Sequence, residues 1–309
     1  MLSATVPASV KELRSRWLDA DIIARVAGSV RAGDSHAGIS PFGAHEGRTD
    51  LRGFRMAPAK LVGVSLEKID FTGAVLNRPW LERCRFVDTV FDHAALEGVS
   101  DQGNHFLNCA FNGTSFRGGG LGYLGSQYHS CMFRRSDFQR AVAIRAEFSD
   151  CRFAQCKLNG LDFNASSFEE CEFEGPVTDV WFRGGFASYT NEERKFGTPR
   201  KNRMLNVSFA NAVLRHLTLS DDCDLSTVIM PTTGEYRKYD HFRERIIRLE
   251  TQAETWPDLC RSGGLRFAKT FRDLAENQSW MIFNLSDILD YSGKDAAAQV
   301  LESMDRAIA

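Results

Sequence analysis

Cysteines are the residues in this chain whose type and spacing could do chemistry. Cys151 and Cys156 stand five residues apart in the stretch CRFAQC, and Cys171 follows them. Three interpretations fit such spacing: a metal site, a disulfide framework, or free thiols that pack as small buried hydrophobes. The choice among them depends on what else in the sequence recurs every five residues.

Large apolar residues recur at that interval through the middle of the chain. A first run comprises Leu51, Met56, Leu61, Leu66, Phe71, Leu76, Leu81, Phe86, Phe91 and Leu96, and a second extends from Tyr128 to Phe173. A smaller residue often precedes the large one by two positions. This spacing fits neither a helix, with a period of 3.6, nor a flat strand, with a period of 2. A strand that slips one residue in every five turns a corner each time, so four corners close a coil of about twenty residues, stacked about 4.8 Å from the next.

This pattern resembles the pentapeptide-repeat family, in which Ala, then Asp or Asn, then Leu are followed by two variable residues. Similar repeats cover about residues 51–178 and 205–227, and SDF at 136–138 and LDF at 161–163 keep the central acidic residue. The resemblance implies a right-handed quadrilateral β-helix. We therefore expect an all-β solenoid with helical additions.

The small position of the repeat decides among the three interpretations of the cysteines. It is occupied by Cys84, Cys109, Cys131, Cys151, Cys156 and Cys171. Neighbouring small positions lie on different walls of the coil, so these thiols are not expected to converge on one metal ion. We predict free, buried thiols in a reducing compartment, and no metal site. Phenylalanines twenty residues apart, such as Phe71, Phe91 and Phe111, are expected to stack.

Two other motifs match known chemistry by chance. GLGYLG at 120–125 has the spacing of a dinucleotide-binding loop, but that site needs a strand before it and a helix after it. Here the motif sits at a slip in the repeat, where glycine permits an irregular turn. SLEK at 65–68 places Leu66 in a core position. We therefore predict no cofactor site and no catalytic residues.

Three zones follow from the change of pattern. Residues 1–50 hold an amphipathic helix near 8–31, residues 51–227 hold the coils, and residues 228–309 show helical spacing. One helical stripe begins at Tyr236 and Tyr239, and the pair Gly263–Gly264 is expected to break two helices. Because a solenoid end exposes apolar surface and unpaired backbone groups, the flanking helices should cap it. The C-terminal region is large enough to bind a partner or to form a homodimer as well.

Two residues do not fit the pattern of apolar inward and polar outward positions in the repeat. Asp101 replaces a large inward residue, and a local bulge that turns it outward is the favoured interpretation, because a buried carboxylate is costly. A buried turn with satisfied hydrogen bonds is the alternative. Trp80 follows an inward position and should point outward. It either contacts a partner or, as we favour, lies beneath the N-terminal helix.

Charge is unevenly distributed near the end of the coils. The stretch from Leu158 to Phe182 contains six acidic residues and no lysine or arginine, and a break in the repeat at 183–203 then carries basic and aromatic residues. We interpret 183–203 as a projecting loop, with packing on the acidic wall as the alternative. The candidate partner-binding residues are Glu169, Glu170, Glu172, Glu174, Phe186, Tyr189, Arg194, Lys195, Arg200 and Lys201.

No arrangement of residues in the sequence matches a constellation for nucleophilic, acid–base or metal catalysis, so we expect a protein that is not an enzyme. The net charge is -2, the N-terminus lacks a signal peptide and no apolar run reaches the length of a membrane span, so we expect a cytoplasmic protein that binds neither nucleic acid nor membrane. We predict a protein-binding scaffold or adaptor. The resemblance implies an alternative: some pentapeptide-repeat proteins mimic duplex DNA and bind DNA gyrase or topoisomerase IV, which gives resistance to quinolones or to a self-made toxin. A DNA mimic should be acidic along its length, whereas residues 51–178 contain 15 acidic and 14 basic residues.

Overall fold

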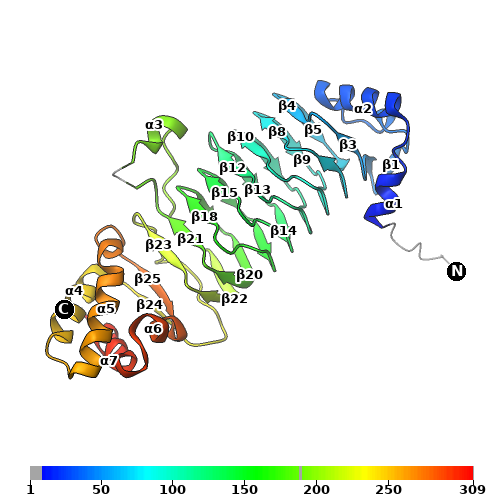
Figure 1. Cartoon of the computed structure of the whole chain (residues 1–309). Helices are drawn as coiled ribbons and strands as arrows, with labels where there is room; N and C mark the ends of the chain where they lie inside the picture. The colour runs from blue at the N-terminus through cyan, green and yellow to red at the C-terminus, as the bar shows by residue number, and fades with distance from the viewer. Residues whose placement is uncertain (1–8, 188–189, 309) are drawn as a thin grey trace. The chain divides into compact units, whose positions relative to one another are not determined.

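The computed structural model describes residues 9–187 and 190–308 (Figure 1). The chain divides into two compact units, Met1–Lys157 and Leu158–Ala309. In both units short parallel strands stack in register and helices are added to them. The prediction of a β-solenoid with helical additions is therefore confirmed. None of the helices in the described ranges combines the length and the apolar character that a membrane span requires.

Strands of the first unit are short and alternate with corners. Leu61 aligns with Leu81 in a parallel pair, and Leu81 aligns with Asp101 in the next. At many corners a residue adopts the left-handed conformation, as Lys68 does with φ 53° and Asp88 with φ 49°. The strands are β1 Ala44–His45, β2 Arg48–Asp50, β3 Arg55–Met56, β4 Lys60–Val62, β5 Ser65–Glu67, β6 Ile69–Asp70, β7 Val75–Leu76, β8 Trp80–Glu82, β9 Arg85–Val87, β10 Ser100–Gln102, β11 His105–Leu107, β12 Gly120–Tyr123, β13 Gln127–His129, β14 Met132–Arg134, β15 Val142–Ile144, β16 Glu147–Ser149 and β17 Arg152–Ala154.

Aromatic side chains stack inside the coils as their spacing predicted. The rings of Phe71 and Phe91 have centroids 5.5 Å apart, and those of Phe91 and Phe111 lie 5.1 Å apart with an interplanar angle of 3°. Phe111 then stacks on Phe133, and Phe133 on Phe153. All five side chains are buried, so this ladder is core and offers no binding surface.

All eight cysteines are free, and the six at the small position of the repeat are buried, which confirms the packing interpretation. Their thiols also hydrogen-bond to the backbone: Cys151 Sγ donates to Tyr128 O at 3.3 Å. Burial raises the pKa of Cys156 to about 12, so its thiol stays protonated and weakly nucleophilic at neutral pH. Cys260, outside the repeat, is only partly buried.

The glycine-rich stretch at 120–125 accommodates an irregular turn, as predicted. Gly122 has φ 84°, and a Cβ atom there would lie 2.4 Å from the backbone nitrogen of Ala146. The register between β10 and β12 shifts at this point. Glycine is thus required both by the backbone conformation and by the close approach of the neighbouring coil.

Asp101 lies in the interior, so the favoured prediction of an outward bulge is wrong. Its side chain is 1% exposed and accepts four hydrogen bonds: from Asn104 Nδ2 at 2.6 Å, Ser126 Oγ at 2.7 Å, Tyr128 OH at 2.7 Å and the backbone nitrogen of Gly122 at 2.8 Å. Burial raises the pKa of Asp101, although these donors oppose the rise. A full set of donors is what lets a polar group remain in an apolar core.

The N-terminal segment forms two helices, α1 Val10–Ser15 and α2 Ala20–Ala32, where one helix near 8–31 was predicted. The chain leaves helical geometry so that Arg16 and Trp17 can reach the first coil. Asp19 then begins α2, since its Oδ1 accepts hydrogen bonds from the backbone nitrogens of Asp21 and Ile22. A short 3₁₀ helix, η1 Ala37–Ile39, precedes β1.

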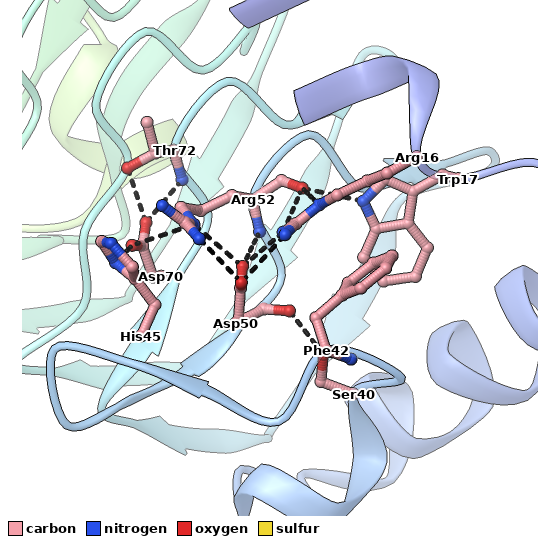
Figure 2. A network of polar contacts seen from close by, with 9 residues as sticks. All are labelled: Arg16, Trp17, Ser40, Phe42, His45, Asp50, Arg52, Asp70 and Thr72. Atoms are coloured by element: carbon pink, nitrogen blue, oxygen red, sulfur yellow. Dashed lines mark hydrogen bonds and ion pairs between the residues drawn. The ribbon is translucent and has the colours of Figure 1, made fainter. Parts of the chain in front are cut away.

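Figure 2 shows the contacts that hold α1 on the first coil. Asp50 is 3% exposed and lies between two guanidinium groups, with Arg16 Nη1 2.9 Å from Asp50 Oδ2 and Arg52 Nη2 also 2.9 Å from it. Trp17 Nε1 donates to Arg52 O at 2.8 Å. A Cβ atom at Gly53 would lie 2.2 Å from Leu13 O, so α1 approaches the coil directly. This segment therefore packs directly on the first coil.

The second unit continues the coils and ends in a mixed region. Its elements are β18 Asp162–Asn164, β19 Ser167–Glu169, β20 Glu172–Thr178, β21 Trp181–Arg183, α3 Glu192–Phe196, β22 Ser208–Arg215, β23 Thr218–Ser220, β24 Tyr236–Tyr239, α4 Phe242–Ala253, α5 Asp258–Ala275, β25 Met281–Asn284, α6 Leu285–Ser292 and α7 Lys294–Asp305. β20 pairs with β22 and β21 with β23, all parallel.

Side chains of the C-terminal region complete the backbone hydrogen bonds of the last coil. Leu214 N donates to Tyr236 OH at 3.1 Å, and Asn284 Nδ2 donates to Leu214 O at 3.2 Å. Gln278 does the same for Cys223: its Oε1 accepts from Cys223 N at 2.9 Å, and its Nε2 donates to Cys223 O at 2.8 Å. The exposed ladder edge is thereby satisfied, which is the physical task of a cap.

Two details of this region differ from the prediction. Tyr236 and Tyr239 belong to β24, which pairs antiparallel with β25, because the tyrosines meet strand partners rather than a helical face. Gly263 and Gly264 lie inside α5 and do not break it. A Cβ atom at Gly263 would lie 2.2 Å from Ser292 O, so glycine there lets the C-terminal end of α6 approach α5 closely.

Candidate functional site

The 183–203 loop is closed at its base by a buried asparagine. Asn202 is fully buried, and its Oδ1 accepts hydrogen bonds from the backbone nitrogens of Phe168 and Met204, both at 3.1 Å. Its Nδ2 donates to Arg183 O at 3.3 Å, and its backbone nitrogen donates to Gly184 O at 2.9 Å. The two ends of the loop are thus joined to each other and to β19. Sequence reasoning had not singled out Asn202, whose only signal is an asparagine three residues before the repeat resumes at about residue 205.

The middle of the loop is packed much less than its base. Helix α3 has no buried side chain, and Arg194 and Lys195 on it are exposed. Lys195 Nζ lies 4.7 Å from the ring centroid of Phe196, whose ring lies 6.2 Å from that of Phe186. One contact with the coils is Asn164 Nδ2, which donates to Glu192 Oε1 at 3.0 Å. Cationic and aromatic side chains are therefore displayed on a short helix whose attachment is fixed.

The basic residues near the end of the loop behave differently. Arg200 forms an ion pair with Glu169, and Lys201 Nζ lies 2.6 Å from Asp222 Oδ2. Both basic side chains are more than half exposed, so each pair contributes little to the free energy of unfolding. Packing on the acidic stretch thus describes Arg200, whereas Lys201 pairs with Asp222 beyond that stretch and α3 projects.

The four acidic candidates lie on two walls of the coil. Glu169 ends β19, and Glu170 follows at a corner with φ 55°. Glu172 and Glu174 lie on β20, the next strand. The corner at Glu170 separates these carboxylates, so they do not form one continuous acidic face.

Phe186 lines a cleft that sequence reasoning missed. The cleft has a volume of about 670 Å³, and the turns before α4 and before β25 contribute Asp240, Glu276 and Trp280 to its lining. Phe186 and Trp280 are far apart in sequence, so no local pattern could have joined them. Tyr189, the remaining aromatic candidate, lies outside the described residues.

A second polar cluster joins α6 to the last coil. His216 N donates to Asp287 Oδ2 at 2.9 Å, and ligand atoms of His216, Asp287 and Asp290 lie within 4.8 Å of one another. Arg215 occupies the space beside both carboxylates, with Nη2 3.2 Å from Asp290 Oδ2 and Nε 3.7 Å from Asp287 Oδ1. Burial raises the pKa of Asp287. We interpret the cluster as an ion-pair contact between coil and cap.

Comparisons with known proteins agree with the repeat pattern. Residues 129–160 and 146–175 match the family model described as pentapeptide repeats, with eight copies. No curated protein matches the sequence.

Similar solved structures cover part of the chain. One is a trypsin-treated variant of QnrB1, a plasmid-mediated fluoroquinolone resistance protein, with 15% identity over 54% of this chain and 77% of that chain and a TM-score of 0.37. Another is HetL, a pentapeptide repeat protein involved in heterocyst differentiation regulation from the cyanobacterium Nostoc, with 14% identity over 59% and 85% of the two chains and a TM-score of 0.33. Similarity at this level carries no argument about function.

Proposed function

We propose that this chain, a pentapeptide-repeat protein, is a non-enzymatic scaffold or adaptor that binds a protein partner through the 183–203 loop. One observation carries the proposal: α3 has no buried side chain, although buried Asn202 fastens the loop at its base. A segment that only bridged two coils would need neither a helix nor half-buried aromatic side chains such as Phe186 and Phe196. Functional residues often lie on such loops, which a rigid framework positions.

The partner-binding residues are proposed to be Arg194 and Lys195 on α3, with Phe186 and Tyr189 as the aromatic contacts. Aromatic and arginine side chains dominate the energetics of many interfaces, which supports this choice. Arg200, Lys201 and the glutamates Glu169, Glu170, Glu172 and Glu174 would contribute a charged rim. We further propose that the protein is cytoplasmic, needs no cofactor or metal, binds neither nucleic acid nor membrane directly, and forms any homodimer through the C-terminal region.

The experiment is a charge reversal of Arg194→Glu with Lys195→Glu, followed by pull-down from the native host. A matched control is Arg134→Glu with Arg135→Glu, because these two consecutive basic residues are also exposed but lie in the first unit. We expect the α3 variant to lose at least about tenfold of partner recovery while circular dichroism stays unchanged, and the control to retain it. Equal recovery by both variants would show that α3 is not the contact.

The alternative function is DNA mimicry towards DNA gyrase or topoisomerase IV, with protection from quinolones or from a self-made toxin. The acidic stretch from Leu158 to Phe182 favours it. Against it, residues 51–157 contain 14 basic and 10 acidic residues, so that part of the solenoid has the wrong sign for a DNA mimic. A supercoiling assay with and without a quinolone separates the two proposals. Inhibition or protection by the intact protein would support mimicry, and no effect would favour the scaffold.

A further inference from the structure

One wall of the first unit concentrates exposed apolar side chains. It is formed by β4, β8, β10, β12 and β15, whose residues align in parallel from Lys60 to Trp80, Ser100, Gly120 and Val142. Trp80 is 41% exposed and Val142 43%. The favoured prediction that the N-terminal helix covers Trp80 is therefore wrong: α2 contacts β3 and β4, yet the indole stays open. We call this surface the Trp80 wall.

The same wall also holds the positive charge of these coils. Residues 51–157 carry four more basic than acidic side chains, and the wall with its two bordering corners accounts for three of the four. The rest of these coils is nearly balanced, with nine basic and eight acidic side chains. The charged residues of the Trp80 wall and its corners are Lys60, Arg78, Arg83, Arg140 and Arg145 against Glu82 and the buried Asp101.

Trp80 is held in place by its neighbours on the wall. Its Nε1 donates to Glu82 Oε2 at 3.1 Å, and Lys60 Nζ lies 5.9 Å from the ring centroid. On the other side Ser100 is small, and beyond it the ring of Tyr123 lies against Gly120, where a Cβ atom would be 2.3 Å from the ring. Two aromatic rings therefore stand on either side of Ser100. A side chain held in advance loses less entropy when a partner binds.

We propose that the Trp80 wall binds an acidic polypeptide segment that also carries apolar side chains. An apolar side chain of the segment packs between Trp80 and Tyr123, over Ser100 and the Gln102 amide that donates to Ser100 Oγ at 2.8 Å, and its carboxylates pair with the arginines at the corners. Charge complementarity favours an acidic partner, and tryptophan is among the residues that typically contribute most to the binding free energy of an interface. Because this wall belongs to the first unit, the proposal is independent of the 183–203 loop.

A nucleic acid fits the wall less well than an acidic peptide. The corner that carries Arg78 and Arg140 has Gly98 and Gly118 at the two intervening coils, so cations on that corner are about three coils, or about 14 Å, apart. A phosphate backbone needs closely spaced cations along its track. Separate arginines around an aromatic centre suit single carboxylates on either side of an apolar anchor.

The test uses a fluorescein-labelled peptide of Glu-Leu-Glu-Phe repeated four times, with fluorescence anisotropy as the readout. A second peptide has Gln in place of Glu. The full-length variants are Trp80→Ala and Arg83→Glu, checked by circular dichroism. The matched control is Arg85→Glu, which is exposed two residues further along on β9, on the next wall. A 20-nucleotide single-stranded DNA serves as the competing probe.

We expect the Glu peptide to bind at least about tenfold more tightly than the Gln peptide, and this difference to shrink in high salt. Trp80→Ala and Arg83→Glu should each weaken binding about tenfold, and Arg85→Glu less than about twofold. The proposal is overturned if the Glu peptide does not bind, if Arg85→Glu weakens binding as much as Arg83→Glu, or if the DNA binds more tightly than the peptide. Self-association in analytical ultracentrifugation that Trp80→Ala abolishes would assign the wall to a second copy instead.

Discussion

Replacing Asp101 with leucine should destabilise this protein, although leucine is what the repeat calls for at that position. In the preceding coil the aligned residue is Leu81. A reading of the repeat alone predicts that Asp101→Leu stabilises the fold by about 2 kcal/mol, the gain from burying a leucine side chain. The hydrogen bonds around Asp101 predict the opposite sign.

The magnitude follows from the four donors that leucine would leave behind. Asn104, Ser126 and Tyr128 are all buried, and the backbone nitrogen of Gly122 is buried with them. An unsatisfied buried polar group costs about 1–3 kcal/mol. Asn104 Nδ2 keeps an acceptor in Leu81 O at 2.8 Å, which reduces its share. After subtracting the gain from leucine burial, we expect the free energy of unfolding to fall by about 4 kcal/mol.

The assay is urea unfolding followed by circular dichroism for a double-mutant cycle with Tyr128→Phe. Phenylalanine occupies the aligned positions Phe106 and Phe148, so this substitution suits the lattice. Tyr128→Phe should cost about 1–2 kcal/mol in the wild type and close to nothing beside Asp101→Leu, because the hydroxyl has already lost its acceptor. An Asp101→Leu protein as stable as the wild type, or two substitutions whose effects simply add, would refute the reasoning.

Three further results are expected. A disulfide reagent should modify Cys260 quickly and the seven buried thiols only on unfolding, as measured by absorbance with and without urea. Burial raises the pKa of Asp50, but hydrogen bonds from Arg16 and Arg52 outweigh burial and hold that pKa well below its usual value of about 3.9. The stability that Asp50 contributes is therefore present above about pH 4 and is lost as the pH falls towards the folded-state pKa. Asp50→Asn should lower the free energy of unfolding by about 3 kcal/mol and weaken the loss of stability at acid pH in thermal melts at pH 2–6. Removal of residues 230–309 should produce aggregates in size-exclusion chromatography, because it takes away the partners of the last coil's backbone; a soluble monomer would show that this region is not a cap.

The coils could be predicted from sequence because the position of a residue within its own five-residue repeat determines whether its side chain is buried. Whether a residue faces in or out depends on its place in that repeat, and Cys151 is buried for the same reason as Phe153. Asp101 was misplaced because three of its four donors come from the following coil, after a slip in the register. Tyr128 lies 27 residues after Asp101, which is not a multiple of five, so the repeat pattern does not place the two residues side by side.

The ends and the loop were harder to predict because their contacts are between residues far apart in sequence. The break between α1 and α2 serves contacts of Arg16 and Trp17 with Arg52, more than thirty residues away. Tyr236 is in a strand because Asn284 pairs with it. The basic character of the 183–203 loop was visible in the sequence, but its division into a fastened base and an open α3 depends on Asn202, whose partners lie on both sides of the loop.

Parallel pairing also determines how the first unit would respond to mechanical load. The hydrogen bonds between one coil and the next, such as that from His105 N to Cys84 O, run along the axis of the coil stack. A pull along that axis would therefore load the outermost coil first and peel the stack open one coil at a time. Each coil of about twenty residues would release about 65 Å of extended chain. An adaptor built in this way would act as a stepwise tether, whose length under tension increases in units of one coil.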